Sequence, residues 1–335
     1  MKVMVLFDLN RKPEPDESFT LKALRKEEMK PTEADVISTL RGLGHEVEQL
    51  AVYDDVREML DKISAFNPEV VFNLCETFFH DRAHEPNIPA LLDLMKVKYT
   101  GAGPEALLLC KDKALTKKLL SFHRIRVAQF VVSYRAHPIR SLKRFRFPAF
   151  VKPVASEASE AISKASFTQN QQETLERAAF IHENFQSDAL IEEYIEGREL
   201  TVGVLGNPRP LTLPPRETFF GMAEEDESAP HFATTKAKFD DAYRKKWKIR
   251  NGPAAPLPEG AAYQLARTAR HAYRILKMRG LCRLDVRLTE KGEVVVIEVN
   301  PNPSLARGDD FAASAKEAGI EYEQLIQRIL DNAVR

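Results

Sequence analysis

Two neighbouring apolar segments near the end of the chain constrain its fold more than any other feature. RLDVRL (283–288) and VVVIEVNPNP (294–303) both read as buried strands, and a short turn at 290–292 joins them. Such a pair predicts an antiparallel hairpin inside a larger sheet. The polar residues within it are therefore informative, because buried strands rarely carry them without a purpose.

Four polar residues interrupt these strands at alternate positions. Arg283 and Asp285 lie two residues apart in the first strand, and Glu298 and Asn300 lie two apart in the second. Side chains two apart in a strand point to the same face, so the hairpin can bring all four together. Two carboxylates and an amide oxygen suit Mg²⁺ bound to nucleotide phosphates. The alternative is a solvated hairpin face, and the apolar flanking residues favour the metal site.

The first third of the chain alternates strand and helix patterns. Apolar strands are expected at 2–7, 47–52 and 70–74, and helical periodicity falls between them at 32–43 and 55–66. This order predicts a small, doubly wound parallel sheet and an α/β fold class. Further along, 207–258 carries eight prolines and a run of charges, and it is expected to be a long, functional connection.

Charge and cysteine content exclude several classes of protein. Lys+Arg and Asp+Glu both total 49, which gives no general electrostatic case for binding nucleic acid or an anionic membrane. The apolar N-terminal stretch is one strand long, too short for a signal peptide or membrane span. The three cysteines are far apart in sequence, which fits reduced core thiols in a cytoplasmic protein.

Two lysines lie at positions where α/β folds bind ligands. Lys113 is near the start of a helix in CKDKALTKKLL (110–120), and Lys152 ends an apolar strand in FPAFVKP (147–153). A single lysine is usually a solvated surface group. Lys152 departs from that expectation, because strand ends in α/β folds face ligand crevices.

Acidic residues cluster in ALIEEYIEGRELTVGVLG (189–206). Glu192, Glu193 and Glu199 surround a tight turn at 196–198 between two strands. A carboxylate there can bond a ribose hydroxyl, while backbone groups at a strand edge can pair with adenine. On spacing alone, a charged hairpin is the better interpretation.

Taken in order, these segments resemble the D-alanine–D-alanine ligase branch of the ATP-grasp superfamily. KYTGAG (98–103) and the five segments quoted above fall where that family has its motifs, and the resemblance covers roughly residues 70 to 330. It implies an ATP-grasp fold preceded by a small Rossmann-like domain. The implied divisions are an N-terminal domain at 1–102, a central subdomain at 103–195, and a C-terminal subdomain at 196–335 with the metal and catalytic residues.

The resemblance also implies roles for individual residues. For the nucleotide these are Lys113 and Lys152 on the phosphates, Ser159 in the phosphate loop, Glu192, Glu193, Tyr194 and Ile195 at the adenine hinge, and Glu199 on the ribose. For the chemistry they are Asp285, Glu298 and Asn300 as magnesium ligands, Arg283 and Lys238 as catalytic residues, and Asn302 and Ser304 at the substrate. Lys236 competes with Lys238 as the lysine that closes over the γ-phosphate.

Several family motifs are missing from this chain. The N-terminal glycine-serine-glutamate motif is absent from 7–17, the stretch 154–163 after Lys152 has no glycine, and Phe239 replaces an aromatic hydroxyl. Asn302, Pro303 and Ser304 stand where the family has serine, proline and glycine. The ATP machinery is therefore expected to be kept and the recognition of the substrates to be changed.

The expected activity is an ATP-dependent carboxylate–amine ligation through an acyl phosphate, giving a dipeptide or a related amide. The expected cofactors are ATP and Mg²⁺ or Mn²⁺. The partners are small amino acids or carboxylates, with no nucleic acid and no membrane, and a homodimer is the family's habit. Two alternatives remain open: an ATP-grasp ligase that adds an amino acid to a peptide or small carboxylate, and an inactive ATP-binding regulatory module.

Overall fold

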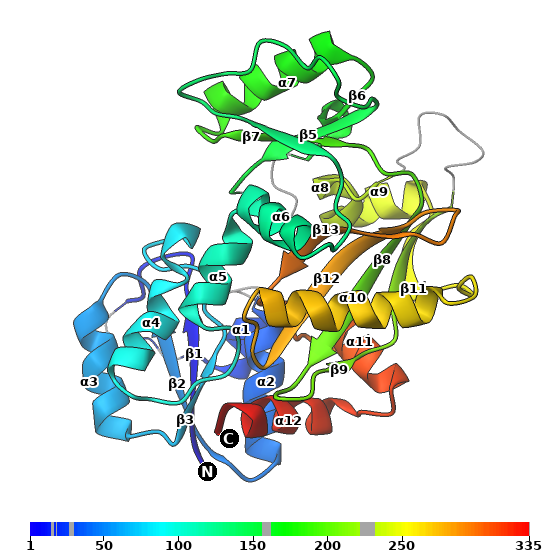
Figure 1. Ribbon diagram of the computed structural model, residues 1–335. Helices are drawn as coiled ribbons and strands as arrows, with labels where there is room; N and C mark the ends of the chain where they lie inside the picture. The colour runs from blue at the N-terminus through cyan, green and yellow to red at the C-terminus, as the bar shows by residue number, and fades with distance from the viewer. Residues whose placement is uncertain (15–16, 18, 27–29, 156–161, 222–231, 335) are drawn as a thin grey trace.

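The chain is described here from a computed structural model (Figure 1). The described residues are 1–335 except 15–16, 18, 27–29, 156–161, 222–231 and 335. Within them the chain forms a parallel sheet and two antiparallel sheets, each covered by helices. This arrangement confirms the α/β class predicted from the sequence.

The N-terminal sheet is parallel and has the strand order β2-β1-β3. Its elements are β1 (Lys2–Asp8), α1 (Leu21–Lys26), α2 (Pro31–Gly42), β2 (Glu46–Val52), α3 (Val56–Phe66), β3 (Val70–Asn73), the 3-10 turn η1 (Arg82–His84) and α4 (Asn87–Leu94). Val3 and Val5 pack on the side of α2, and Met4 and Leu6 pack on the side of α3. Both faces of β1 are therefore buried, which explains its unbroken apolar sequence.

The central sheet is antiparallel, with the order β4-β7-β5-β6. Two helices lead into it, and its elements are α5 (Pro104–Lys111), α6 (Lys113–Phe122), β4 (Phe130–Ser133), β5 (Ala149–Pro153), the 3-10 turn η2 (Lys164–Ser166), β6 (Phe167–Thr168), α7 (Gln171–Asn184) and β7 (Ala189–Glu193). α7 covers one face, where Ile181 packs with Val151 and Ile191. Figure 1 shows α6 between this sheet and the C-terminal sheet.

The C-terminal sheet is antiparallel, has the order β11-β10-β8-β12-β13, and carries β9 as an extra partner of β8. Its elements are β8 (Arg198–Leu205), β9 (Leu211–Thr212), β10 (Arg216–Phe220), α8 (Thr235–Phe239), α9 (Asp241–Lys246), β11 (Ile249–Pro253), α10 (Ala261–Ile275), β12 (Leu281–Leu288), β13 (Val294–Asn300), α11 (Asp310–Glu317) and α12 (Tyr322–Val334). The described part of 207–258 thus contributes strands and short helices to this sheet. These strands and helices are not evident from the sequence, because the many prolines of the segment are typical of loops.

One face of the C-terminal sheet is apolar and is covered by α10. Val202 of β8 and Leu284 of β12 pack there against Leu265 and Ala269 of the helix. The helix lies along that face in Figure 1. The opposite face carries Arg283 and Asp285 of β12, while Leu205 of β8 and Leu281 of β12 join the core of the N-terminal sheet.

The last helix of the chain packs against the first sheet. Leu325, Ile326 and Ile329 of α12 share one core cluster with Val3 of β1 and Ile37 of α2. Figure 1 shows α12 beside the N-terminal elements, with both ends of the chain close together. The two ends of the sequence therefore stabilise one common core.

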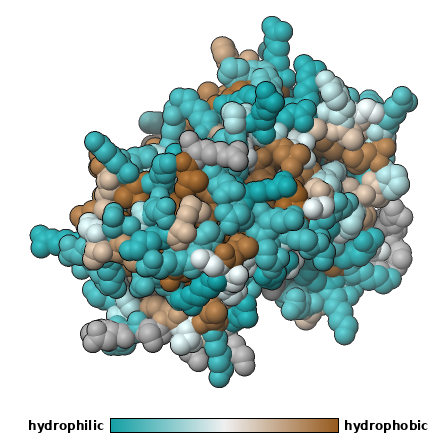
Figure 2. All heavy atoms as spheres, turned by 90° about the horizontal axis from the view of Figure 1, so that it is seen from below, coloured by the Kyte–Doolittle hydropathy of each residue, from teal (hydrophilic) through white to brown (hydrophobic). Residues whose placement is uncertain are grey.

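The surface is mainly hydrophilic on the face drawn in Figure 2, with apolar atoms in scattered groups between polar ones. In the part of the chain that the structure describes, no helix combines the length and apolar character that crossing a membrane requires.

Candidate active site

The four polar residues of the C-terminal strand pair do converge on one sheet face. β12 and β13 pair antiparallel, with Arg283 directly opposite Asn300 and Asp285 directly opposite Glu298. Directly paired residues in an antiparallel ladder share a face. The prediction that the hairpin brings all four together is confirmed.

A β-bulge sets which residues of β13 face the site. Asp285 pairs with Glu298, but the next residue, Val286, pairs with Val296, so Ile297 is the extra residue. A bulge of this kind changes the phase of the alternation. Val294 and Val296 accordingly pack in the core before the bulge, whereas Val299 does so after it. Residues 294–297 are all apolar (VVVI), so the sequence pattern does not show this change of phase.

Lys113 reaches the polar face from α6. The helix begins where Asp112 accepts a hydrogen bond from Leu115 N, and this N-cap fixes Lys113 in the first turn. The Lys113 ammonium lies 3.4 Å from Glu298 Oε1, and its side chain is 6% exposed. An ammonium group so nearly buried needs an anionic partner. The contact joins α6 to the C-terminal sheet.

Lys152 lies at the end of β5 in a buried ion cluster. Its ammonium is 2.7 Å from Glu192 Oε2 on the neighbouring strand β7, and both side chains are almost fully buried. Burial opposes charge on Lys152, but Glu192 and Glu298 raise its pKa above the ordinary value. Glu192, predicted at the adenine hinge, therefore has its carboxylate turned to the lysines.

Lys117 completes this cluster and was not singled out from the sequence. It lies one helical turn after Lys113, and its ammonium is 2.5 Å from Glu192 Oε1. The only sequence signal is the four-residue spacing of the two lysines, which puts them on one face of α6. In a segment that also contains Lys118, that signal is weak.

Glu298 is strongly biased toward its ionised form. Burial raises the pKa of its carboxyl, but Lys113, Lys152, Lys238 and Arg283 together lower that pKa to about 2. Lys238 in α8 is thus among the cations whose charge acts on Glu298. Ser159 lies outside the described residues.

Arg283 is held by a neighbouring carboxylate of the same strand. Its Nε and Nη2 lie 2.7 and 3.0 Å from the two oxygens of Asp285, a bidentate pair. Burial opposes the charge on Arg283, but Asp285 and Glu298 raise the pKa of its guanidinium. The arginine is therefore a fixed cation beside the candidate metal ligands.

The hinge between β7 and β8 connects two different sheets. β7 belongs to the central sheet and β8 to the C-terminal one, so the charged-hairpin interpretation of 189–206 is wrong. Glu193 N and Tyr194 N donate to Gln129 O and Pro148 O. Among the described residues, the backbone amides of Ile195, Glu196 and Gly197 have no such acceptor.

Glu199 is paired with a residue that the sequence analysis missed. Arg287, directly opposite it on β12, brings Nη2 to 2.5 Å from Glu199 Oε1 and donates through Nη1 to Gly197 O. Ala233 N also donates to Glu199 at 3.3 Å. Arg287 therefore fixes both the hinge and the predicted ribose carboxylate.

Asn302 and Ser304 lie where the C-terminal sheet meets the N-terminal domain. Asn302 N donates to Asn300 Oδ1 at 2.9 Å, and Asn302 Nδ2 donates to Cys75 O at 3.4 Å. The hydroxyl of Ser304 is 3.1 Å from that of Thr32. Both predicted substrate residues thus contact the N-terminal part of the chain.

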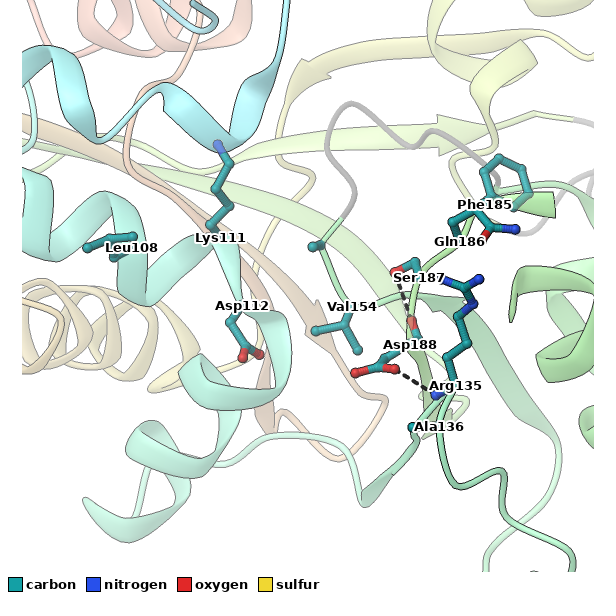
Figure 3. Close-up of a pocket in the computed structure, with 11 residues that line it drawn as sticks. Leu108, Lys111, Asp112, Arg135, Ala136, Val154, Phe185, Gln186, Ser187 and Asp188 are labelled. Carbon is teal, nitrogen blue, oxygen red and sulfur yellow. Dashed lines mark hydrogen bonds between the residues drawn. The ribbon is translucent and has the colours of Figure 1, made fainter. Parts of the chain in front are cut away.

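A cavity of about 950 Å³ lies beside this cluster. Its lining includes Asp112 and Val154, which are close in sequence to Lys113 and Lys152, but neither lysine lines it. Figure 3 shows Asp188 directed at the backbone of Arg135, and Asp188 Oδ1 accepts from Arg135 N at 2.7 Å. The cavity thus lies next to the chain positions of Lys113 and Lys152, and the candidate metal ligands do not line it.

The donor set suits a hard divalent ion that keeps much of its coordination for phosphate and water. It consists of the carboxylates of Asp285 and Glu298 and the amide of Asn300. Mg²⁺ is usually bound through one or two carboxylates together with nucleotide phosphates, rather than by a complete protein cage. Among the described residues, no group of three or more His, Cys, Asp or Glu is arranged to hold a metal.

Comparison with known proteins gives a consistent picture. The family model described as "D-ala D-ala ligase C-terminus" matches residues 116–331. An uncharacterized protein, y4sG, of Sinorhizobium fredii is 29% identical over 90% of this chain and 86% of its own length. The D-alanine–D-alanine ligase of Prosthecochloris aestuarii is 29% identical over 84% of this chain and 79% of its own.

A solved structure matches along the whole fold. It is a D-alanine–D-alanine ligase from Bacillus anthracis complexed with ATP, with a TM-score of 0.75 and 17% identity, covering 100% of this chain and 98% of that one. The likeness confirms the predicted ATP-grasp fold.

Proposed function

The chain belongs to the D-alanine–D-alanine ligase family, and from that premise we propose that it is an ATP-dependent carbon–nitrogen ligase forming a dipeptide or a related amide. One observation carries the proposal for the site. Lys113 of α6 lies against Glu298 of β13, on the face that also bears Arg283 and Asp285. Positive and negative groups suited to a metal-bound triphosphate are thereby assembled between two sheets.

The reaction needs two displacements. A carboxylate oxygen of the first substrate attacks the γ-phosphorus of ATP, and ADP leaves with the electron pair of the broken P–O bond. The amine nitrogen of the second substrate then attacks the acyl carbon, inorganic phosphate leaves, and the amine loses a proton. Phosphoryl transfer depends mainly on positioning and neutralisation of charge.

The cations of the site would supply that neutralisation. In our proposal, Lys113 and Lys152 contact the phosphates, and Arg283 meets the charge that develops on the transferring phosphate and then on the tetrahedral oxygen. Lys238 would close over the γ-phosphate. Its effect on the pKa of Glu298 supports a position near the reacting groups.

Asp285, Glu298 and Asn300 would hold Mg²⁺, or Mn²⁺ in its place. When bound, the ion supplies positive charge to the phosphate oxygens. The low pKa of Glu298 keeps that carboxylate ionised and available as a ligand at neutral pH. The bidentate contact keeps Asp285 beside Arg283.

The nucleotide base would be held at the hinge between the sheets. We assign the unpaired amide of Ile195 to adenine, with the backbone of Glu193 and Tyr194 as its neighbours, and Glu199 to the ribose. Ser159 is proposed for the phosphate loop. Asn302 and Ser304, at the border with the N-terminal domain, would contact the amino-acid substrates.

A screen of D- and L-amino acids, alone and in pairs, tests this function. The purified chain is incubated with MgATP, ADP release is followed, and the product is identified by mass. ADP release that depends on two amino acids, with a dipeptide product, is expected. Release only with a peptide or a small carboxylate as acceptor would favour the other ATP-grasp reaction. Binding of ATP without turnover on any substrate would refute the ligase.

Two further features belong to the proposal. The three cysteines are buried and free, which supports a reducing compartment such as the cytoplasm. We also propose a homodimer, for which the exposed side chains of Leu94 and Phe122 are candidate contact residues. Light scattering over a range of concentrations would test the dimer.

A further inference from the structure

Lys117 is a buried cation with no evident path to the nucleotide. Its side chain is 2% exposed, compared with 6% for Lys113. Its contacts are with protein groups from two different sheets. One lies on β7 of the central sheet, and the other lies on β13 of the C-terminal sheet.

On the central sheet, Lys117 shares one carboxylate with Lys152. Lys117 Nζ is 2.5 Å from Glu192 Oε1, and Lys152 Nζ is 2.7 Å from Glu192 Oε2. The Glu192 carboxylate therefore bridges the two ammonium groups. An ammonium has three donors, so Lys152 can hold Glu192 and still donate to a phosphate. Its position depends on where Glu192 is held.

On the C-terminal sheet, Lys117 contacts the β-bulge. Its ammonium donates to Ile297 O at 3.0 Å, and Ile297 is the extra residue of the bulge. The carbonyl of a bulged residue is withdrawn from the ladder and can accept from elsewhere. The following residue is Glu298, whose direction the bulge determines. The Lys117 side chain thus helps to fix the positions of both Lys152 and Glu298.

The charge of this cluster argues against a purely structural role. A buried ion pair is weak evidence for stability, because removing charges from water costs about as much as their attraction returns. Here three lysines, Lys113, Lys117 and Lys152, face two carboxylates, Glu192 and Glu298, so these five buried or partly buried groups together carry a net positive charge. Such a charge is unfavourable for the empty protein and favourable for a protein that holds a polyphosphate.

We infer that Lys117 is a positioning residue for MgATP, which holds Glu192 and the Ile297 bulge so that Lys152 and Glu298 both face the nucleotide. The inference rests on the proposed function, since it presumes that ATP binds between the two sheets. Lys117 itself contacts neither ATP nor metal. Its effect reaches the nucleotide through two neighbours.

Lys117→Met tests this by direct binding. The affinity for MgATP is measured by isothermal titration calorimetry without amino acids, so the readout does not depend on turnover. The dissociation constant is expected to rise about tenfold to a hundredfold, the range for disturbing a hydrogen bond to a charged group. Lys118→Met is the matched control, because Lys118 is the exposed neighbour on the same helix, and it should stay within about twofold.

Kinetics separate positioning from loss of folded protein. The KM for ATP is expected to rise in Lys117→Met, while the KM for the amino-acid substrates stays unchanged. A variant that is only less well folded would lower kcat and leave both KM values as they were. Lys117→Gln is the second variant if the methionine chain does not fold. Its amide can still donate to Ile297 O but no longer carries charge to Glu192.

A double-mutant cycle with Glu192→Gln tests the route. Lys117→Met should weaken ATP binding less in the Glu192→Gln background than in the wild type. Additive effects, or an unchanged ATP affinity in both Lys117 variants, would overturn the inference and leave the ligase proposal standing. A wild-type chain that does not bind ATP would overturn the proposed function itself.

Discussion

At the scale of single residues, the site is dominated by groups that hold one another in place. Arg283 is paired with Asp285, Lys113 with Glu298, and Arg287 with Glu199. Each pair joins a proposed functional residue to a partner that fixes its direction. Preorganisation of this kind lowers the cost of aligning charges when the reacting groups arrive.

Arg283→Ala is expected to fold normally and to lose about 10²–10³ in turnover, the scale for removing one donor to a developing oxyanion. The reason is that the bidentate contact with Asp285 fixes this guanidinium on the strand face that bears the candidate metal ligands. ADP release under saturating substrates measures the loss. Arg267→Ala, an exposed arginine on α10, should keep full activity. Near-normal ligation by Arg283→Ala would remove the arginine from the mechanism.

The low pKa of Glu298 predicts a pH-dependent contribution to stability. Its folded pKa of about 2 lies below the ordinary 4.5, so the stabilisation is complete above about pH 4.5 and is lost as the pH falls toward 2. Urea unfolding of the wild type and of Glu298→Gln compares the two proteins. The advantage of the wild type in the free energy of unfolding should be constant down to about pH 5 and should shrink as the pH falls from about 4.5 toward about 3. A constant difference would mean that the four cations do not act on this carboxyl.

The sequence revealed the polar residues of the strands better than those of the helices. In β12 and β13, four polar side chains stand out against apolar neighbours and converge as expected. Lys117 gives no such contrast, because lysines are common on helices and its burial depends on Glu192, which is 75 residues away. Arg287 is concealed for a similar reason, since its partner Glu199 lies on another strand.

At the scale of elements, the hinge glycine is the most constrained backbone position near the site. Gly197 has φ +142°, and a Cβ there would lie 2.3 Å from the carbonyl oxygen of Leu288. Only glycine accepts both the conformation and the close approach. The direction in which the chain leaves the central sheet for β8 therefore depends on this residue.

Gly197→Ala is expected to destabilise the protein by about 1–3 kcal/mol, because the backbone must move or remain strained. Gly42→Ala is the matched control, since nothing lies within 4 Å of its added Cβ in the last turn of α2. It should be neutral or stabilising by up to about 1 kcal/mol. Urea unfolding followed by circular dichroism measures both. Equal stability of the two variants would contradict the close approach to Leu288.

Strand patterns predicted most of the sheets, and connections were the main source of error. β12, β13 and the parallel N-terminal strands follow from apolar runs. The turn around Gly197 was read as a hairpin because adjacent strands usually pair, whereas β7 and β8 find other partners in separate sheets. Local sequence does not encode those partners. The strands β9 to β11 were missed because prolines surround them.

At the scale of the whole molecule, one core cluster combines residues from both ends of the chain. α12 completes the core of the N-terminal sheet, and the same cluster continues through Leu205 of β8 and Phe311 of α11. The spacing of the apolar residues in 322–334 is typical of an amphipathic helix. Its docking site on the first sheet depends on long-range contacts that no local pattern specifies.

Ile326→Ala is expected to lower the free energy of unfolding by about 2–4 kcal/mol, the range for a large-to-small change in a packed core. Ile326 is fully buried against the N-terminal sheet, whereas Arg328 on the same helix is exposed. Arg328→Ala should change stability by less than about 0.5 kcal/mol. Hydrogen exchange should locate the loss in β1 and α2 as well as in α12. Protection lost from α12 alone would mean that the first sheet is stable without it.

The position of α12 also has a consequence for how the protein is made. The strands of the first sheet are synthesised long before α12, which covers part of it. One face of the nascent N-terminal sheet therefore stays uncovered while more than two hundred further residues are translated. During that interval the uncovered apolar face is open to non-native contacts. Premature termination just before Tyr322 would leave every proposed catalytic residue in the product and still yield a chain whose opening domain lacks its cover.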